Sequence, residues 1–267
     1  MILVFDIGNT ETTVGVFDGE RLHAHWRLVT DVNQTPDEID LQLRALLSSR
    51  NIAVSDITGT AIGSVVPALT APLGEACLGL FGSPSVNVDA RSPLPITLDV
   101  LEPLTVGADR IVNTLAASRL FGRDTIVVDL GTATTYDCIT AEGVFLGGVI
   151  APGMRTSAET LFRRTSKLPA TELVAPERVI GRRTEDCIRA GVVFGTAESV
   201  DGIVRRIKSE WPTPREPLVV ATGGLAPMIK PHCREIERLE PDLTLVGLRM
   251  AFELIGQRAA GSRTAVT

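Results

Sequence analysis

The sequence predicts an α/β fold built from two similar units in tandem, and three observations support this. An apolar run at residues 2–7 contains Asp6 near its end and leads into DIGNT. A second apolar run from Thr125 contains Asp129 and leads into DLGTATT. After each run the sequence continues with two more strand-like segments and then with helices alternating with strands. The two carboxylates lie roughly one domain length apart, which is typical of an internal duplication of a β-rich unit.

The first half begins with a nearly continuous apolar run, as expected for a strand covered on both faces. A strong helix start follows, with Thr35 as N-cap, Pro36 at the first helical position and Glu38 completing a capping box. Later segments predict a buried strand, a short strand and a helix. The expected strands are 2–7, 13–17 and 21–29, then GTAIGS before Pro67 and SVNVD, and the last helix is GADRIVNTLAASRLFG.

Gly122-Arg123-Asp124 forms a break, after which the pattern restarts. The expected second-half elements are strands at TIVVDLG, 134–140 and VFLGGVIAPG, a helix at 184–208, a strand at PLVVATGG and a helix at LVGLRMAFELIGQR. We therefore expect an N-terminal domain at 1–122 and a C-terminal domain at 123–256. The segment 257–267 is small and polar, and we expect a frayed tail there.

Composition narrows the class of protein. Hydrophobic residues make up 44% and charged residues 22%, and the net charge is −6. These are globular proportions, and the acidic balance argues against binding nucleic acid. No apolar run reaches the length of a membrane span, and the N-terminus does not resemble a signal peptide. The four cysteines form no CxxC pair, so neither a zinc site nor a disulfide framework is indicated. We expect a cytoplasmic protein.

The two hairpins are the first candidates for chemistry. A Gly two residues after each Asp allows a close approach of backbone or phosphate. Backbone N–H groups and hydroxyls in such a turn can bind phosphate oxygens, and the carboxylate can bind a cation directly or through water. A single DIGNT is more often an ordinary hairpin, but two copies in register favour a phosphate-binding role. No GxxxxGK[ST] motif is present, which excludes a P-loop.

Two further stretches each leave two interpretations. VATGG ends a buried strand with bare backbone, where an adenine or ribose could lie; it could equally be the turn before a helix. In VGADR, Asp109 and Arg110 begin an apolar helix. An acidic residue there favours the helix dipole. Asp109 could also be a general base, with Arg110 holding an anionic substrate.

The ordered set DIGNT, SVVP, VGADR, DLGTATTYD, GGVIAPG, TGG and PDLTLVGL closely resembles the type III pantothenate kinases. The resemblance spans about residues 1–256, and GADR followed by DxGTATT is its specific part. It implies duplicated actin-like (ribonuclease H-like) domains, each a mixed sheet with flanking helices, in the superfamily of actin, sugar kinases and Hsp70-type ATPases. It also implies ATP-dependent phosphorylation of pantothenate, the first step of coenzyme A biosynthesis.

The resemblance also implies roles by position. Asp109 is the catalytic proton acceptor, Asp129 holds a monovalent cation (K⁺ or NH₄⁺), and Asp6 contacts Mg²⁺ through water. The implied ATP contacts are Asp6, Ile7, Gly8, Asn9, Thr10, Glu11, Thr12, Thr13 and Thr132; Gly223 of the TGG turn joins them. The implied pantothenate contacts are Gly107, Ala108, Asp109, Arg110 and Thr184, the last supplied across a homodimer interface.

One position departs from the family pattern. Members often carry a Tyr that packs on pantothenate a few residues before GADR, and Val100 stands there in this sequence. The departure bears on substrate affinity more than on the type of reaction. Two alternatives remain open: another phosphotransferase of the same superfamily, and a non-catalytic accessory or regulatory member of the family. Asp6, Asp109 and Asp129 are all present, which favours an enzyme.

Overall fold

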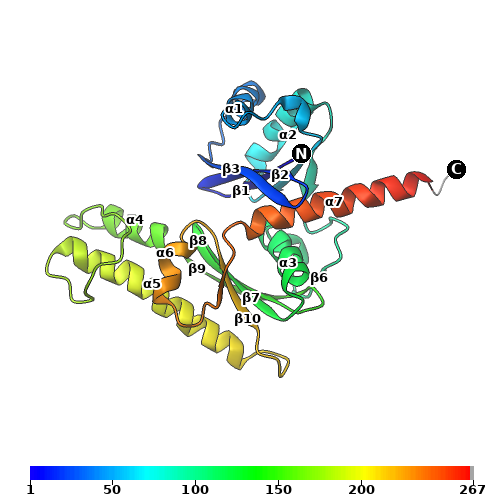
Figure 1. Ribbon diagram of the computed structural model, residues 1–267. Coiled ribbons are helices and arrows are strands. Elements are labelled where there is room, and N and C mark those ends of the chain that lie inside the picture. The colour runs from blue at the N-terminus through cyan, green and yellow to red at the C-terminus, as the bar shows by residue number, and fades with distance from the viewer. Residues whose placement is uncertain (265–267) are drawn as a thin grey trace. The chain divides into compact units, whose positions relative to one another are not determined.

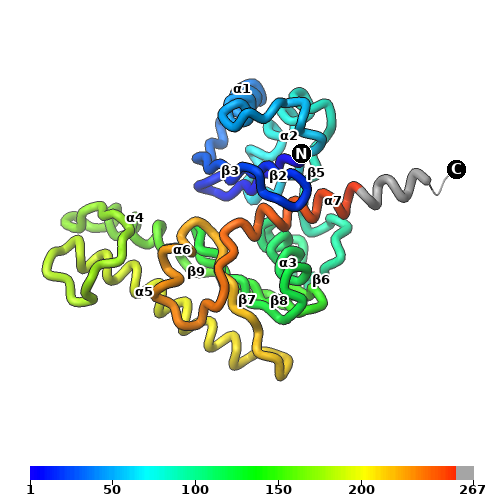
Figure 2. The backbone as a smooth tube through the Cα atoms, viewed as in Figure 1, coloured from blue at the N-terminus to red at the C-terminus, as the bar shows by residue number. Residues whose placement is uncertain are grey.

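The computed structural model describes residues 1–264, with side chains described through residue 256, and divides into two compact units. Unit 1 comprises Met1–Ala116 and the chain from Leu243 onward, and unit 2 comprises Ala117–Asp242. The chain leaves unit 1 within the helix α3 (Ala108–Phe121) and returns just before the helix α7 (Leu243–Thr264), which can be followed in Figure 2.

Unit 1 is built on a sheet of order β3-β2-β1-β4-β5 (Figure 1). The strands β1, β2 and β3 form an antiparallel meander, and β4 pairs with β1 in parallel. The strands are β1 (Ile2–Ile7), β2 (Glu11–Asp18), β3 (Arg21–Val29), β4 (Gly59–Ser64) and β5 (Val86–Val88). The other elements are α1 (Pro36–Ser48), α2 (Pro67–Phe81), the two-residue strand β6 (Thr97–Leu98) and the 3₁₀ turns Val54–Asp56 and Pro103–Thr105.

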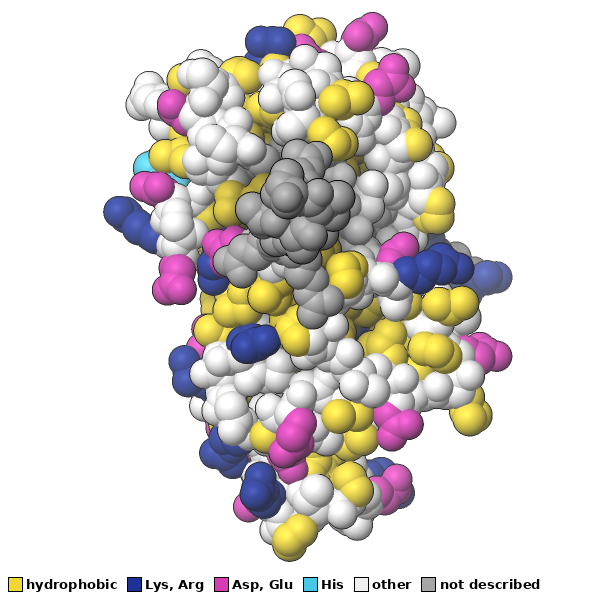
Figure 3. Space-filling view, turned by 90° about the vertical axis from the view of Figure 1, so that its right-hand side faces the viewer, with side chains coloured by type: hydrophobic (Ala, Val, Ile, Leu, Met, Phe, Trp, Pro, Cys, Tyr) yellow, Lys and Arg dark blue, Asp and Glu magenta, His cyan; other side chains and the backbone are white. Residues whose placement is uncertain are grey.

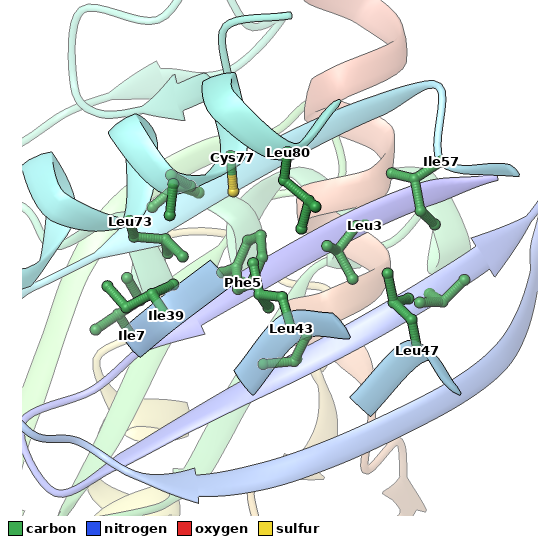
Figure 4. Close-up of a cluster of buried hydrophobic side chains, with 14 of the residues drawn as sticks. Leu3, Phe5, Ile7, Ile39, Leu43, Leu47, Ile57, Leu73, Cys77 and Leu80 are labelled. Carbon is green, nitrogen blue, oxygen red and sulfur yellow. The ribbon is translucent and has the colours of Figure 1, made fainter. Parts of the chain in front are cut away.

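The two faces of this sheet bury different helices. One face packs on α1 and α2 through an apolar cluster that includes Leu3, Phe5 and Ile7, as Figure 4 shows. The other face carries Val4 and Ala61, which cluster with residues of α3 and α7. Successive side chains on a strand point to opposite faces. Asp6 therefore lies on the α3 and α7 face, whereas Ile7 lies on the α1 and α2 face.

The five strands that belong to unit 2 repeat the same connectivity, in the order β9-β8-β7-β10-β11. Again three antiparallel strands are followed by two that add in parallel on the side of the first. The strands are β7 (Thr125–Leu130), β8 (Ala133–Ile139), β9 (Val144–Pro152), β10 (Leu218–Thr222) and β11 (Arg238–Leu239). The helices are α4 (Met154–Arg164), α5 (Thr184–Ser209) and α6 (Ala226–Ile229), the last followed by a 3₁₀ turn at Lys230–His232.

Sequence and structure agree on fold class and on the order of the major elements. The capping box at the start of α1 is present, with Glu38 N donating to Thr35 Oγ1 at 3.3 Å and Thr35 N donating to the Glu38 carboxylate at 2.8 Å. The repeated strand order supports the duplication that the two hairpin motifs indicate.

The division into units differs from the sequence boundaries at α7. Chain order puts this helix in the expected domain 123–256, but its residues Leu245 and Leu248 pack on the sheet of unit 1. Glycines on that sheet make room for it: a Cβ at Gly63 would lie 2.8 Å from Leu248 Cδ2. The first eight residues of the expected tail, 257–264, are the last turns of α7, and 265–267 lie outside the described residues.

On the face in Figure 3, basic and acidic side chains are interspersed rather than gathered in one stripe. Within residues 1–264, no helix is both long and apolar enough to cross a membrane.

Candidate active site

The first hairpin joins β1 to β2 through the short turn at Gly8, Asn9 and Thr10. Gly8 N donates to Glu11 O at 3.0 Å and closes the turn. A Cβ on Gly8 would lie only 3.0 Å from that same carbonyl oxygen, so a larger residue would strain the closure. Asn9 and Thr10 are exposed at its tip. The backbone of the turn is therefore accessible to a ligand.

Asp6 sits next to this turn, on the face that α3 covers. It pairs with Thr13 of β2 on one side and with Gly63 of β4 on the other. Thr12 points to the opposite face and is only 6% exposed. A nucleotide contact by Thr12 would therefore have to come from its backbone, whereas Asp6 and Thr13 share the face on which α3 begins.

The GADR stretch lies at the same end of the same face. A Cβ on Gly63 would lie 3.7 Å from Ala108 Cβ, so the first residue of α3 is directly beside the strand neighbour of Asp6. Gly107 is fixed by a close approach of its own: a Cβ there would collide with Asp109 Oδ1 and would lie 3.2 Å from Val65 Cγ1. Unit 1 thus brings the first hairpin and GADR together at the carboxyl ends of β1 and β4.

Asp109 has the electrostatic setting of a proton acceptor. Burial raises the pKa of its carboxyl above the usual range, against the opposing effects of the Arg110 N–H, which donates to Asp109 Oδ1 at 2.9 Å, and of the Arg110 charge. A carboxylate whose pKa is raised holds a proton more tightly and is a better general base. The hydrogen bond from Arg110 fixes the orientation of the acceptor oxygen.

The second hairpin, in unit 2, joins β7 to β8 through Gly131 and Thr132. Gly131 N donates to Ala133 O at 3.0 Å, which closes a turn one residue shorter than the first, where Gly8 N donates to Glu11 O. Asp129 pairs with Thr135 of β8 and with Thr222 of β10, as Asp6 pairs with β2 and β4. Thr132 is exposed in the turn. The two hairpins are therefore equivalent in strand pairing, and their turns differ in length by one residue.

Gly223 brings the TGG turn against Asp129. Its φ of +88° is in the region that favours glycine. A Cβ there would collide with Asp129 Oδ1 and lie 2.8 Å from Leu130 N. Unit 2 therefore gathers Asp129, Thr132 and Gly223 at one end of its sheet. Thr184 lies elsewhere, exposed at the first residue of α5.

Two threonines of the hairpins' surroundings were not found by sequence reasoning. Thr30 Oγ1 donates to Gly8 O at 2.7 Å, and Thr156 Oγ1 donates to Thr132 O at 2.7 Å. Neither residue belongs to a motif, and each is 22 or 24 positions away from the turn it contacts. Only the tertiary fold identifies them.

Oxygen ligands are the donors these sites offer to a cation. Within the described part of the chain, no group of three or more His, Cys, Asp or Glu is arranged to hold a metal ion. The half-buried carboxylate of Asp129, with Gly223 packed against it, offers oxygen ligands of the kind that suit a hard cation. Asp6, beside an open turn, suits a contact to a hydrated cation that arrives with a phosphate.

Two units whose five strands follow the same order, each with a carboxylate beside a glycine turn, define a protein of the actin-like fold. Solved structures share this fold. The activator of the 2-hydroxyisocaproyl-CoA dehydratase from Clostridium difficile, with bound ADPNP, aligns at a TM-score of 0.59 and 14% identity over 100% of this chain and 98% of that one. A putative 2-dehydro-3-deoxygalactonokinase from Sinorhizobium meliloti aligns at 0.56 and 13% identity, over 96% and 97%.

Sequence comparison then identifies the family. The family model for type III pantothenate kinase matches residues 2–206. A type III pantothenate kinase of Acidothermus cellulolyticus is 44% identical over 256 residues, 95% of this chain and 98% of the relative. One of Moorella thermoacetica is 42% identical over 255 residues, with 95% and 99% covered. The chain belongs to the type III pantothenate kinase family.

Proposed function

We propose that this chain transfers the γ-phosphoryl group of ATP to the primary hydroxyl of pantothenate, giving 4'-phosphopantothenate, with Asp109 as proton acceptor. Membership of the family supplies the reaction, which opens coenzyme A biosynthesis. The observation that supports the role of Asp109 is its position on unit 1: a half-buried carboxylate with a raised pKa, on the same sheet face and at the same strand ends as the first hairpin.

Phosphoryl transfer of this kind depends on positioning and charge stabilisation. The attacking hydroxyl needs a partner that orients it and takes its proton, which is the role of Asp109. The turn at Gly8–Thr10, together with Ile7, Glu11 and Thr13, offers backbone and hydroxyl donors to the phosphates of ATP, and Thr132 and Gly223 offer the corresponding contacts in unit 2. ATP binds as its magnesium complex, and Asp6 contacts that ion through water.

Asp129 holds a monovalent cation, potassium or ammonium, in this proposal. The support is the donor chemistry described above: one half-buried carboxylate among backbone groups, a set too weakly charged for a dedicated divalent site. When bound, the cation adds positive potential near the phosphates. The contribution of the protein is to fix the Asp129 carboxylate against Gly223.

Pantothenate is recognised by Gly107–Arg110. The Arg110 guanidinium suits the substrate carboxylate, because its planar fork can bind both oxygens. Val100, half-buried before the 3₁₀ turn that precedes GADR, offers an apolar side chain without a hydroxyl. We expect it to contribute less to pantothenate binding than an aromatic residue would.

A homodimer completes the site in this proposal, with Thr184 contributed by the partner subunit. The segment before Thr184 carries a concentration of exposed large apolar side chains: Leu161, Phe162, Val174, Val179 and Ile180, from 39% to 85% exposed. Exposed apolar groups of this density favour burial against another surface. Cytoplasmic location is part of the same proposal. Sedimentation of the purified protein tests the oligomeric state directly.

One assay tests the reaction. Purified protein is incubated with ATP and Mg²⁺, and ADP release is followed with pantothenate or with a panel of sugars, in the presence and absence of potassium. We expect ADP release only with pantothenate, stimulated by potassium. Release with a sugar instead would favour another phosphotransferase of the superfamily, and no acceptor-dependent release would favour an accessory role.

A further inference from the structure

Thr30, the residue after β3, makes two hydrogen bonds to the turn of the first hairpin. Its backbone N donates to Thr10 O at 3.0 Å, and its Oγ1 donates to Gly8 O at 2.7 Å. These bonds reach the carbonyls at both ends of the turn. The turn is therefore fixed to a third strand as well as to the two strands it connects.

The Thr30 hydroxyl is itself held by a buried partner. Its oxygen lies 2.9 Å from Thr12 Oγ1. A hydroxyl carries one hydrogen, and that of Thr30 goes to Gly8 O, so Thr12 is the donor in this pair. Thr12 is 6% exposed. The result is a chain of hydrogen bonds from Thr12 through Thr30 to Gly8, in which each bond polarises the next.

This chain has a consequence for the ligand side of the turn. In a planar trans peptide, the C=O and the following N–H point in opposite directions. Because the Gly8 C=O points toward Thr30, the N–H of Asn9 points away from it, and the Thr10 C=O orients the N–H of Glu11 in the same manner. A backbone turn binds phosphate through N–H groups that face the anion while its carbonyls face elsewhere.

We propose that Thr30 is a positioning residue for ATP. Its hydrogen bonds turn the carbonyls of Gly8 and Thr10 away from the ligand, so that the N–H groups of the first hairpin face the phosphates. The inference rests on the proposed function, since it takes the hairpin to be a phosphate site. Thr30 does not contact the nucleotide itself and acts through Gly8 and Thr12.

The turn of the second hairpin is also held by a threonine hydroxyl, but through fewer hydrogen bonds. Thr156 of α4 donates from Oγ1 to Thr132 O at 2.7 Å, which directs the N–H of Ala133 away from α4. Gly153, the residue before α4, allows this approach, because a Cβ there would collide with the carbonyl of Thr132. Thr156 is exposed and its hydroxyl donates a single bond to the turn. We expect it to contribute less than Thr30.

The test is the isosteric change Thr30→Val, which keeps the shape and the N–H bond to Thr10 but removes the hydroxyl. Loss of two side-chain hydrogen bonds predicts a rise of about tenfold in the KM and the Kd for Mg·ATP, with the KM for pantothenate within about twofold of its original value. Thr30→Ser retains the hydroxyl and is expected to bind ATP within about threefold of the parent. Thr156→Val is expected to weaken ATP binding by at most about threefold.

The matched control is Thr58→Val. The Thr58 hydroxyl also donates to a backbone carbonyl, that of Met1 at 3.1 Å, but at the opposite end of β1 in the same sheet. It is expected to leave both KM values unchanged. Should Thr30→Val fail to fold by circular dichroism, the comparison of Thr30→Ala with Thr30→Ser decides the matter, because both remove bulk and only one keeps the hydroxyl.

Three results would overturn the proposal: ATP binding by Thr30→Val within twofold of the parent, an equal rise in KM for both substrates, or a Thr30→Ser as weak as Thr30→Val. Calorimetric binding of Mg·ATP needs no acceptor. A parent protein that binds ATP but does not phosphorylate pantothenate would therefore refute the proposed reaction and still report on Thr30.

Discussion

The hairpin of unit 1 and the hairpin of unit 2 share their strand pairing but differ in what lies beside the strand-end carboxylate. Asp6 has the start of α3, with Asp109, near its end of the sheet. Asp129 has the TGG turn packed directly on it. Duplication therefore accounts for the shared strand pairing of the two hairpins, while the group proposed for proton transfer lies in unit 1 and the carboxylate proposed for cation binding lies in unit 2.

The largest effect is expected from removing the Asp109 carboxylate, which belongs to unit 1. Asp109→Asn is expected to lower kcat by roughly 10²- to 10⁴-fold, the usual effect of losing a general base. The raised pKa of Asp109 also predicts that the parent loses activity as the pH falls through that pKa, and that this acidic limb is absent from the residual activity of the variant. Initial rates across pH check both. Asp18→Asn, at the exposed last residue of β2, is the control. A near-normal rate for Asp109→Asn would exclude the role.

The group specific to the second hairpin is tested by Asp129→Ala. If Asp129 holds the monovalent cation, the ratio of rates with and without potassium falls to about one, since the ligand is gone. Rates at several potassium concentrations, with ATP and pantothenate saturating, measure this ratio. Asp124→Asn, at the other end of the same strand, should keep the potassium response of the parent. An Asp129→Ala protein still activated as strongly as the parent would place the cation elsewhere.

Much of this comparison could be predicted from sequence because it rests on local patterns. Apolar runs located β1 and β7, the capping box located α1, and the repeated Asp-x-Gly located both hairpins. The hydrogen bonds from Thr30 and Thr156 to the two turns could not be predicted, because these residues reach the turns through tertiary contacts that follow no fixed sequence spacing. The unit to which α7 belongs could not be predicted for a related reason: chain order does not show which sheet an apolar helix face covers.

A smaller effect is expected from a substitution that tests the role of the TGG turn. Gly223→Ala forces a Cβ onto Asp129 Oδ1 in addition to the cost of a positive φ, and we expect about a tenfold loss in kcat/KM for ATP, with a loss of about 1–3 kcal/mol in stability. Gly122→Ala is the matched control, because Gly122 has a φ of +57° but no atom within 4 Å of its would-be Cβ. Steady-state kinetics and urea unfolding of the two variants separate the steric effect from the backbone effect. Equal losses in both would mean that the contact with Asp129 is unimportant.

The two units also differ at the amino ends of their central strands, which predicts the smallest effect. Before β7, the Asp124 carboxylate is 3% exposed and accepts hydrogen bonds from Ala141 N at 2.9 Å, Trp211 Nε1 at 3.0 Å and Thr213 Oγ1 at 2.8 Å. Before β1, only backbone groups of Met1 take part: its carbonyl accepts from Thr58, and its amino group donates to Asp56 O at 2.7 Å. The carboxylate thus ties the segment 211–213 to the residue before β7. In Asp124→Asn, at least one of these donors faces the amide NH₂ group, which cannot accept its hydrogen bond. We expect a loss of about 1–3 kcal/mol in unfolding free energy at neutral pH, with little change in kcat.

The pH dependence distinguishes this bond set from simple packing. These hydrogen bonds lower the pKa of Asp124 in the folded state, although its burial acts in the opposite direction. A carboxyl with a lowered folded pKa contributes its full stabilisation above the unfolded value of about 3.9, and the contribution is lost as the pH falls through the folded pKa. The difference in stability between parent and Asp124→Asn should therefore be constant from neutral pH down to about 5 and shrink below about 4.

Glu216→Gln, which removes an exposed partner of Lys208, is the control and should show a much smaller difference. A parent-to-variant gap that stays the same at pH 3 would mean that Asp124 acts by shape and not by charge, and that the amino ends of β1 and β7 are held by the same kind of contact after all.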